Sequence, residues 1–308
     1  MRTVIVGCGQ IAGGYNEQSE SEILTHVLAW RSLGVDIVGC CDIRPEQAEA
    51  FASRWGIPQW RTELSLLLAD TRPDIVSLCT PAAAQQASVA ALVASPSVKA
   101  ALVEKPLGAS ARDAEAVARM LVQWARPAIV NYYRAFDPAY QQLAYEAHAG
   151  TMGALRRVVA CYYGAARTNA SHLLERVLAT AGPSGEAFRV GARGESPMFI
   201  VPFAGGEAVF VPVRDTDYAP LEMDFLFERG RHRMIDSEQR AERYEAVPDP
   251  NFPGFVTLGP GVPALAPTFR AFRRPFEALA RAACGAPLEV DTIGAGVQVT
   301  RILDAVSN

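Results

Sequence analysis

Short runs of apolar, β-branched residues alternate with longer stretches rich in Ala, Leu, Glu and Arg over the first 130 residues. The short runs lack polar alternation, which is typical of strands covered on both faces in a parallel sheet. The pattern therefore predicts a doubly wound α/β domain with right-handed crossovers. Its predicted strands are Thr3–Val6, Asp36–Cys41, Asp74–Cys79, Ala100–Glu104 and Ala128–Val130, and its predicted helices are Ile23–Ser32, Pro45–Trp55, Ala83–Ala94 and Ala111–Ala125.

The pattern changes after Asn131, where short strand-like runs follow one another with turns between them. Strands in direct succession, joined by turns that contain glycine, favour an antiparallel or mixed sheet. The segment Pro248–Pro267 is rich in Pro and Gly and predicts an extended surface loop. The predicted strands are Leu155–Tyr163, Phe188–Val190, Met198–Val201, Ala208–Val213, Met223–Phe227 and Arg233–Ile235, and the predicted helices are Pro138–His148, Ser171–Thr180, Phe269–Ala283 and Thr292–Val306.

The composition excludes several classes of protein. The 308 residues are 50% apolar and 20% charged, which excludes a disordered chain and fits two domains. The net charge is −4 and no run of Lys or Arg exceeds two residues, so we expect neither a nucleic-acid nor a membrane partner. No apolar run approaches the roughly 18 residues that span a bilayer, and the N-terminus lacks a secretory apolar region. We expect a soluble, cytoplasmic protein.

The cysteines and histidines form no metal-binding pattern. None of the six cysteines belongs to a C-x-x-C pair, and most lie in apolar, strand-like runs, as small buried side chains in a reducing compartment do. The four histidines lack H-x-x-x-H spacing, and we interpret His26, His148 and His232 as structural or surface residues. We therefore expect no metal site.

The first strand leads into a glycine turn that matches the pattern G-x-G-x-x-G/A. Here Gly7 permits a tight bend, Gly9 lets the backbone approach a pyrophosphate, and Ala12 keeps the packing position small. The helix expected after the turn offers its unpaired N–H groups to the anion. This context predicts that Gly7, Gly9, Gln10, Ile11 and Ala12 bind a dinucleotide, with a tight packing turn as the alternative.

Asp42 and Arg44 follow the second strand and bear on the choice of cofactor. A carboxylate at this place can accept a hydrogen bond from a ribose 2′-hydroxyl and repels a 2′-phosphate, so Asp42 indicates NAD. A guanidinium can pair with that phosphate, so Arg44 leaves NADP open. Asp42 lies 30 residues after Ala12, against about 20 in the common pattern. We interpret the polar stretch Gly13–Glu22 as an added loop beside the cofactor.

Glu104-Lys105-Pro106 follows the fifth predicted strand, at the carboxyl edge where open α/β sheets bind ligands. Lys99 and Lys105 are the only lysines among 29 basic residues. Burial can tune an ammonium but not a guanidinium, so a retained lysine is suggestive of chemistry. We expect Glu104 to hold the Lys105 ammonium beside the cofactor and Lys105 to stabilise a reacting oxygen. A surface lysine is the alternative.

With these segments and Cys79-Thr80-Pro81, the chain resembles the Gfo/Idh/MocA oxidoreductase family over nearly its whole length. Asn131–Pro138 resembles the segment that leads into the family's second domain, and Asn169–Leu174 resembles the helix start that carries the catalytic histidine. The resemblance implies a Rossmann domain at residues 1–128 and a substrate-binding and oligomerisation α/β domain with an open, mostly antiparallel sheet at residues 129–308. It also implies hydride exchange between NAD(P) and a sugar-like alcohol, and we expect a homo-oligomer formed through the C-terminal sheet.

Hydride transfer from a secondary alcohol needs one group that accepts the hydroxyl proton and another that stabilises the alkoxide. His172 suits the first role by its intrinsic pKa and Lys105 suits the second, although in the family the residue that transfers the proton varies. Asn169 orients His172, bonds a substrate hydroxyl, or caps the helix. Thr168 stands where many relatives carry Asp, so His172 is expected to be a weaker base.

Further residues complete the predicted site. Thr80 and Pro81 are expected to touch the cofactor, with a generic strand-end turn as the alternative. Gln85 stands where the family often has His and is expected to keep a polar contact near the cofactor. Arg134 clamps a substrate carboxylate or phosphate, or else forms an interdomain ion pair. Tyr163 is expected to face the substrate cleft.

We therefore predict an NAD(P)-dependent oxidoreductase that acts on a secondary alcohol or ketone of a sugar, nucleotide-sugar or cyclic polyol. One alternative is a catalytically inactive dinucleotide-binding sensor on the same fold, which the retention of Lys105 and His172 opposes. Another is a methyltransferase, which also begins with a glycine turn and a strand-end acid.

Overall fold

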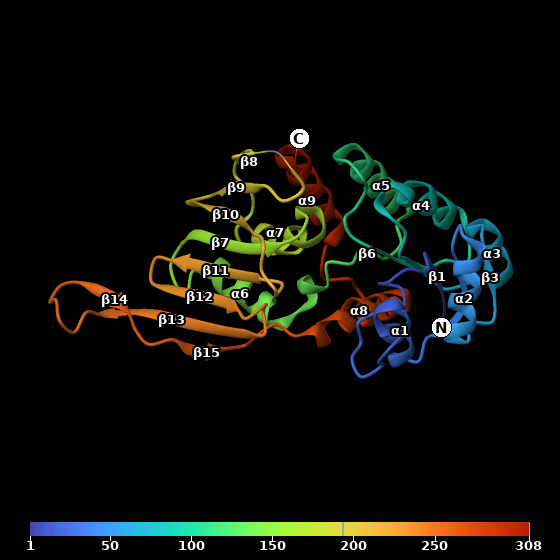
Figure 1. The fold of residues 1–308 in the computed structure, drawn as a ribbon, viewed down its shortest axis with the longest axis horizontal. Helices are drawn as coiled ribbons and strands as arrows, with labels where there is room; N and C mark the ends of the chain where they lie inside the picture. The colour runs from blue at the N-terminus through green and yellow to red at the C-terminus, as the bar shows by residue number, and fades with distance from the viewer. Residues whose placement is uncertain (193, 308) are drawn as a thin grey trace. The chain divides into compact units, whose positions relative to one another are not determined.

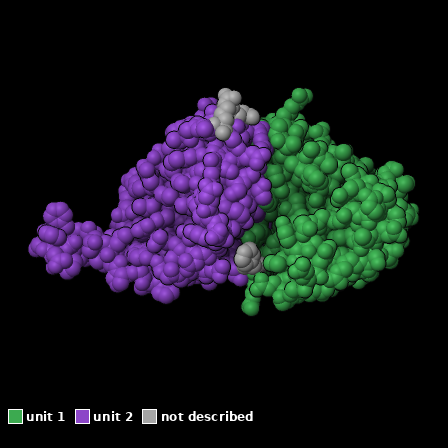
Figure 2. Space-filling model, viewed as in Figure 1, with its two compact units in different colours: residues 1–133, 269–300 green, residues 134–268, 301–308 purple. Residues whose placement is uncertain are grey.

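The computed structural model describes residues 1–192 and 194–307. They form two compact units (Figure 2), of which unit 1 holds residues 1–133 and 269–300 and unit 2 holds residues 134–268 and 301–308. The chain thus returns to its first unit, whereas we expected everything after residue 128 to form the second domain. The reason is apolar packing: Phe276, on α8 (Arg274–Ala283), is fully buried with its ring 5.0 Å from that of Trp30.

Unit 1 is built on a six-stranded parallel sheet with the strand order β3-β2-β1-β4-β5-β6. The strands are β1 (Arg2–Val6), β2 (Asp36–Cys41), β3 (Trp60–Arg61), β4 (Ile75–Leu78), β5 (Ala100–Val103) and β6 (Ala128–Val130). All residues of β4, β5 and β6 are buried, because helices cover both faces of the sheet. The carboxyl ends of the parallel strands meet at one edge, and the predicted doubly wound sheet is confirmed.

The helices of unit 1 begin and end at recognisable signals. Pro45 occupies the first turn of α2, and Gly56 ends that helix with a left-handed φ of 59°. Ser110 caps α5 by accepting a hydrogen bond from the N–H of Asp113. The helices are α1 (His26–Ser32), α2 (Pro45–Trp55), α3 (Leu64–Thr71), α4 (Gln85–Ala94), α5 (Ala111–Trp124), α8 and α9 (Thr292–Ser307), whose last residues belong to unit 2. The sequence patterns did not predict β3 or α3.

Unit 2 is built on a nine-stranded sheet with the order β14-β13-β12-β11-β7-β10-β9-β8, in which β15 pairs with β13 (Figure 1). Only β7 and β10 run parallel, so the predicted open, mostly antiparallel sheet is confirmed. The strands are β7 (Leu155–Tyr163), β8 (Phe188–Val190), β9 (Met198–Phe203), β10 (Gly206–Val213), β11 (Leu221–Phe227), β12 (Gly230–Ile235), β13 (Arg240–Pro248), β14 (Val256–Leu258) and β15 (Val262–Ala264).

One face of this sheet is buried and the other is open. Buried and half-exposed residues alternate along β9 and β11. The buried ring of Phe199 on β9 stacks 4.4 Å from that of Phe210 on β10. The helices α6 (Pro138–His148) and α7 (Ser171–Ala181) pack against each other, and α7 contacts β7. The segment Pro248–Pro267, predicted to be a loop, contains β14 and β15, because both find hydrogen-bond partners on the unpredicted strand β13.

Candidate cofactor and active site

The glycine turn follows β1 at the carboxyl edge of the unit 1 sheet. Gly7 has a φ of +87° and donates its N–H to the carbonyl oxygen of Cys41 at 2.7 Å. A Cβ on Gly7 would lie 2.7 Å from the carbonyl oxygen of Cys79, so the fold itself requires glycine there. A Cβ on Gly9 would meet no described atom within 4 Å. The described fold therefore leaves open space at Gly9, where a pyrophosphate could approach the backbone.

The predicted added loop separates the glycine turn from α1. After a turn in which Tyr15 donates its N–H to the Gln10 carbonyl, the chain leaves the helical path and α1 begins only at His26. The N–H groups of His26 and Val27 donate to the carbonyls of Ile11 and Ala12, so α1 continues the interrupted turn. Its first two donors are thus bonded to the turn. The Gly13–Glu22 stretch, predicted as an added loop, lies within this excursion.

A buried asparagine organises this added loop. The side-chain amide of Asn16 donates to the carbonyls of Ser19 and Glu22, both at 2.8 Å, and its oxygen accepts from the N–H of Leu24 at 3.2 Å. At the base of the loop, Gly13 packs against the ring of Trp55. The sequence did not indicate Asn16, because its role depends on backbone groups of the loop that only the folded chain brings together.

Asp42 lies beside the glycine turn and holds it in place. Its carboxylate accepts hydrogen bonds from the N–H groups of Cys8 and Arg44, each at 3.0 Å. The Arg44 guanidinium lies 3.5 Å from the same carboxylate, and its side chain is 61% exposed. Gln47, on α2, donates to the Cys8 carbonyl at 2.6 Å, so the Cys8 residue is held at both its N–H and its carbonyl. Gln47 is a residue that the sequence patterns did not single out.

The turn after β4 packs against the glycine turn. The Cβ position of Gly7 faces the Cys79 carbonyl and the N–H of Thr80. The Thr80 hydroxyl oxygen is buried and has no hydrogen-bond partner among residues 1–192 and 194–307, whereas Pro81 is exposed. A buried hydroxyl without a hydrogen-bond partner raises the free energy of the folded protein. A ligand that supplied this partner would therefore bind more tightly. Gly9 and Thr80 together fit a dinucleotide at this edge.

Glu104 ends β5 and its carboxylate is the centre of a buried network. Oε1 accepts from His26 Nε2 at 2.8 Å and from the Asn131 amide at 2.5 Å. Oε2 accepts from the N–H of Lys105 at 3.2 Å. Burial by itself raises the pKa of Glu104, but the hydrogen bond and charge of His26 and the hydrogen bond from Asn131 outweigh it, so the pKa lies below the usual range. These bonds come from His26, Asn131 and the backbone, and the charge of Lys105 also lowers the Glu104 pKa. That Glu104 holds the Lys105 ammonium beside a cofactor stays a prediction.

Gln85 has a different position from the one expected. It is buried at the start of α4, and its amide nitrogen donates to the carbonyls of Glu104 at 2.6 Å and Pro106 at 3.1 Å. Its oxygen accepts from the N–H of Gly108 at 2.8 Å. These bonds commit the side chain to the backbone that carries Lys105. Gln85 therefore positions the Lys105 segment, and the polar contact near the cofactor that we expect of it stays a prediction.

In unit 2, His172 is the second residue of α7 and is half-buried. The π-helical turn η4 (Ala166–Ala170) precedes it. Within that turn, the Asn169 amide donates to the Tyr163 carbonyl at 2.7 Å and ties the end of β7 to the helix start. Tyr163 itself is exposed, on the same side of β7 as Cys161, whereas Tyr162 is fully buried. Lys105 belongs to unit 1 and His172 to unit 2.

Arg134 is not available as the expected substrate clamp. Its side chain is buried, and its Nε lies 2.9 and 2.8 Å from the two carboxylate oxygens of Glu238, to which Tyr140 also donates. Asp236, Ser237 and Glu238 all have positive φ values, so this pairing holds a strained turn in place. The ion pair lies within unit 2, which differs from both the clamp and the interdomain pair expected from the sequence.

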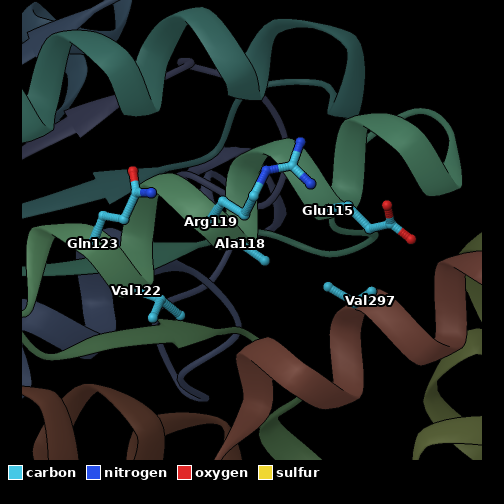
Figure 3. Close-up of a pocket in the computed structure, with 6 residues that line it drawn as sticks. All are labelled: Glu115, Ala118, Arg119, Val122, Gln123 and Val297. Atoms are coloured by element: carbon cyan, nitrogen blue, oxygen red, sulfur yellow. The ribbon is translucent and has the colours of Figure 1, made fainter.

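One surface hollow of unit 1 contains none of the predicted site residues (Figure 3). It is lined by Glu115, Ala118, Arg119, Val122 and Gln123 of α5, with Val297 of α9 opposite. Among the described residues, no group of three His, Cys, Asp or Glu side chains could hold a metal ion. No described helix has both the length and the apolar character needed to cross a bilayer.

Comparisons with known proteins bear on both units. Residues 1–132 match the family model GFO_IDH_MocA, described as an oxidoreductase family with an NAD-binding Rossmann fold. A curated relative, the 4-carboxy-2-hydroxymuconate-6-semialdehyde dehydrogenase of Sphingobium sp. (strain NBRC 103272 / SYK-6), is 32% identical over 130 residues. That match spans 42% of this chain and 41% of the relative.

Solved structures match over nearly the whole chain. The UDP-N-acetylglucosamine 3-dehydrogenase GnnA of Acidithiobacillus ferrooxidans has a TM-score of 0.77 at 19% identity, covering 100% of this chain and 98% of its own. The WlbA dehydrogenase of Bordetella pertussis, in complex with NADH and UDP-GlcNAcA, has a TM-score of 0.75 at 17% identity, covering 99% and 94%. A putative myo-inositol dehydrogenase of Sinorhizobium meliloti 1021 has a TM-score of 0.73 at 18% identity, covering 99% and 96%.

At these identities the structures establish a shared fold, and the family model goes further for the N-terminal part. Its description confirms the expected NAD cofactor. Over residues 1–132 the chain is similar to the NAD-binding Rossmann-fold domain of that oxidoreductase family.

Proposed function

We propose that the protein is an NAD-dependent oxidoreductase that transfers a hydride between nicotinamide and a secondary alcohol or ketone of a sugar, nucleotide-sugar or cyclic polyol. The observation that carries the proposal is the meeting of two motifs at one sheet edge. The Gly7–Ala12 turn follows β1 and the Lys105 segment follows β5, and parallel strands bring both to their common carboxyl edge. Ligands of open α/β sheets bind at that edge.

The residues around the glycine turn would hold the dinucleotide. The open space at Gly9 suits the pyrophosphate, and the Thr80 hydroxyl would gain the partner that the described residues do not supply. Asp42 is suited to the ribose 2′-hydroxyl, because its carboxylate is fixed by Cys8 and retains further acceptor capacity. The exposed Arg44 leaves the 2′-phosphate of NADP as an alternative. When bound, nicotinamide supplies the carbon that accepts or donates the hydride.

Lys105 and His172 would carry the proton chemistry. The Lys105 ammonium donates a hydrogen bond to the reacting oxygen and stabilises the negative charge that develops there. The His172 imidazole takes the hydroxyl proton in the oxidative direction and returns it in the reductive direction. Asn169 would keep the helix start of His172 in place through its bond to the Tyr163 carbonyl. Tyr163 remains a predicted substrate contact.

Three relatives support the substrate class. The named substrates of the structural relatives are a UDP-sugar and an inositol, and the WlbA structure holds both NADH and a UDP-sugar. These compounds share vicinal secondary hydroxyls on a six-membered ring. We therefore place the substrate of this protein among ring compounds with secondary alcohols.

A homo-oligomer formed through the unit 2 sheet is part of the proposal. Val209 on β10 pairs with Ile200 on β9 and with Val159 on β7, and all three side chains lie half-buried on the open face. Two residues further along, Val211 on β10 pairs with Cys161 on β7, and both side chains are half-buried. Val211→Glu places a charge in this patch, and we expect light scattering to show a smaller assembly than that of the wild type. An unchanged mass would contradict this interface.

The proposal is tested by a substrate screen with cofactor controls. Purified protein is titrated with NAD, NADP and S-adenosylmethionine while tryptophan fluorescence is recorded, and then assayed for NADH absorbance at about 340 nm with UDP-sugars, free sugars and inositols. We expect saturable binding of NAD and turnover with at least one ring alcohol. Binding of NAD without any turnover would favour a sensor, and binding of S-adenosylmethionine alone would favour a methyltransferase.

A further inference from the structure

A histidine at the start of α1 connects the two motifs of the proposed site. The backbone N–H of His26 donates to the Ile11 carbonyl, within the glycine turn, at 3.1 Å. Its side chain reaches the carboxylate of Glu104, with Nε2 and Oε1 2.8 Å apart. One fully buried residue thus bonds the glycine turn through its backbone and the residue before Lys105 through its ring.

The ring of His26 is fixed from its other side as well. Nδ1 lies 2.7 Å from the hydroxyl of Ser77 on β4, and that hydroxyl accepts a hydrogen bond from the Trp30 indole N–H at 3.1 Å. The rings of Phe276 and Phe272 pack edge-on at 4.8 and 6.1 Å. Rotation of the imidazole would break two hydrogen bonds and these ring contacts together, so the orientation of Nε2 is determined.

Donor and acceptor accounting assigns the direction of each bond. The Ser77 hydroxyl already accepts from Trp30, so its own hydrogen is available for Nδ1 of His26. With Nδ1 as the acceptor, the ring hydrogen that faces Glu104 is the one on Nε2. The ionised Glu104 can only accept, and Nε2–H donates to it. In this series of hydrogen bonds, which runs from the Trp30 indole through Ser77 and His26 to Glu104, each donor faces an acceptor.

Glu104 connects the His26 side chain to the backbone of the Lys105 segment. Its second oxygen accepts the N–H of Lys105, and its backbone carbonyl accepts the Gln85 amide. The carboxylate therefore fixes the backbone from which the Lys105 side chain projects. Without the donor at His26, a buried anion would lose one of its two side-chain hydrogen bonds and would be expected to move towards another cation.

We propose that His26 is a positioning residue for Lys105, acting through Glu104, and this inference rests on the proposed function. It would place Lys105 for the chemical step without contacting substrate or cofactor. A small misplacement of a reacting group lowers turnover more than it lowers ground-state binding. The separation of turnover from cofactor affinity is therefore the property to measure.

The test compares two isosteric variants in the full-length protein. In His26→Gln the amide nitrogen occupies the place of Nε2 and can still donate to Glu104, whereas in His26→Asn the shorter amide reaches only the Ser77 side. His26→Leu removes both bonds and keeps the apolar volume. Phe276→Leu is the matched control, because it loosens packing around the imidazole and removes no polar atom. For each variant kcat, KM, the Kd for NAD and the melting temperature are measured with a substrate of the wild type.

We expect His26→Asn and His26→Leu to lower kcat about tenfold or more while the Kd for NAD stays within about twofold, and His26→Gln to stay within about threefold of wild-type kcat. Phe276→Leu should lower the melting temperature and leave kcat near the wild-type value. Equal kcat for the Gln and Asn variants would overturn the inference, even if His26→Leu fails to fold. Absence of turnover by the wild type would overturn the proposed function and the role of His26 with it.

Discussion

The carboxylate of Asp42 accepts a hydrogen bond from the backbone N–H of Cys8, with Oδ2 and N 3.0 Å apart. The residue expected to select the cofactor therefore also fixes the turn that would bind the pyrophosphate. Charge and turn geometry are two separate contributions, and different substitutions at Asp42 remove them separately.

Asp42→Asn removes the charge and keeps an acceptor for Cys8. We expect the preference for NAD over NADP to shrink about tenfold, because a carboxylate no longer repels the 2′-phosphate. Asp42→Ala also removes the acceptor, so it should weaken both cofactors and NAD more than NADP. Fluorescence titration of each protein with both cofactors gives the comparison. A larger loss for NADP than for NAD would mean that the preference was misread.

Gly7 and Gly9 lie in the same turn, but only at Gly7 does the fold exclude a side chain. At Gly7 a side chain meets backbone at 2.7 Å with φ at +87°, so Gly7→Ala should lower the free energy of unfolding by about 1–3 kcal/mol or more. At Gly9 a Cβ meets no atom of the described residues within 4 Å, so Gly9→Ala should change stability by no more than about 1 kcal/mol.

The Gly7→Ala and Gly9→Ala variants also distinguish an effect on stability from an effect on cofactor binding. A methyl group on Gly9 occupies the space proposed for the pyrophosphate, and we expect the Kd for NAD to rise about tenfold or more in Gly9→Ala. Urea unfolding and cofactor titration on the two variants provide the data. Unchanged NAD affinity in a folded Gly9→Ala protein would argue that the dinucleotide lies elsewhere.

A helix or strand could be predicted from the sequence where its own residues form a recognisable pattern. The start of α2 was predicted because Pro45 marks it, and β2 because uncharged residues with apolar or small side chains follow Asp36 as far as Cys41. The strand β3 has two residues, and the apolar run in α3 shows no single helical face, so neither was recognised. The helix α8 was expected, but its return to unit 1 depends on the packing of Phe276, which no local pattern encodes.

The same distinction applies to the candidate site. The glycine turn, Asp42 and the Lys105 segment follow strands directly, so their common edge could be inferred from strand order. The partners of Gln85 and Arg134, the 104–108 backbone and Glu238, could not be predicted because they lie 19 or more residues away in sequence. His26 was interpreted only as a structural or surface residue for the same reason, since Glu104 lies 78 residues further along the chain.

The lowered pKa of Glu104 makes part of the stability depend on pH. Because the folded-state pKa lies below the ordinary value of 4.5, the ionised carboxylate stabilises the fold above pH 4.5, and this contribution is lost as the pH falls through the folded pKa. Glu104→Gln lacks this titration. We expect it to be about 1–3 kcal/mol less stable than the wild type at pH 7, with a gap that narrows below pH 4.5.

Urea unfolding of both proteins between about pH 3 and pH 7 tests this expectation, and the other carboxylates cancel because both proteins carry them. A gap that stays constant across the range would show that Glu104 does not titrate as its hydrogen bonds from His26 and Asn131 require.

The central claim is that Lys105 takes part in hydride transfer, and its most direct test is the turnover of Lys105→Ala beside that of Lys99→Ala. Lys99 is the only other lysine of the chain and pairs with Asp74 at the surface, so it is a matched control. With a ring alcohol that the wild type oxidises, we expect kcat of Lys105→Ala to fall about a hundredfold or more while the Kd for NAD stays within about twofold. Lys99→Ala should match the wild type, and an unchanged kcat in Lys105→Ala would contradict the account.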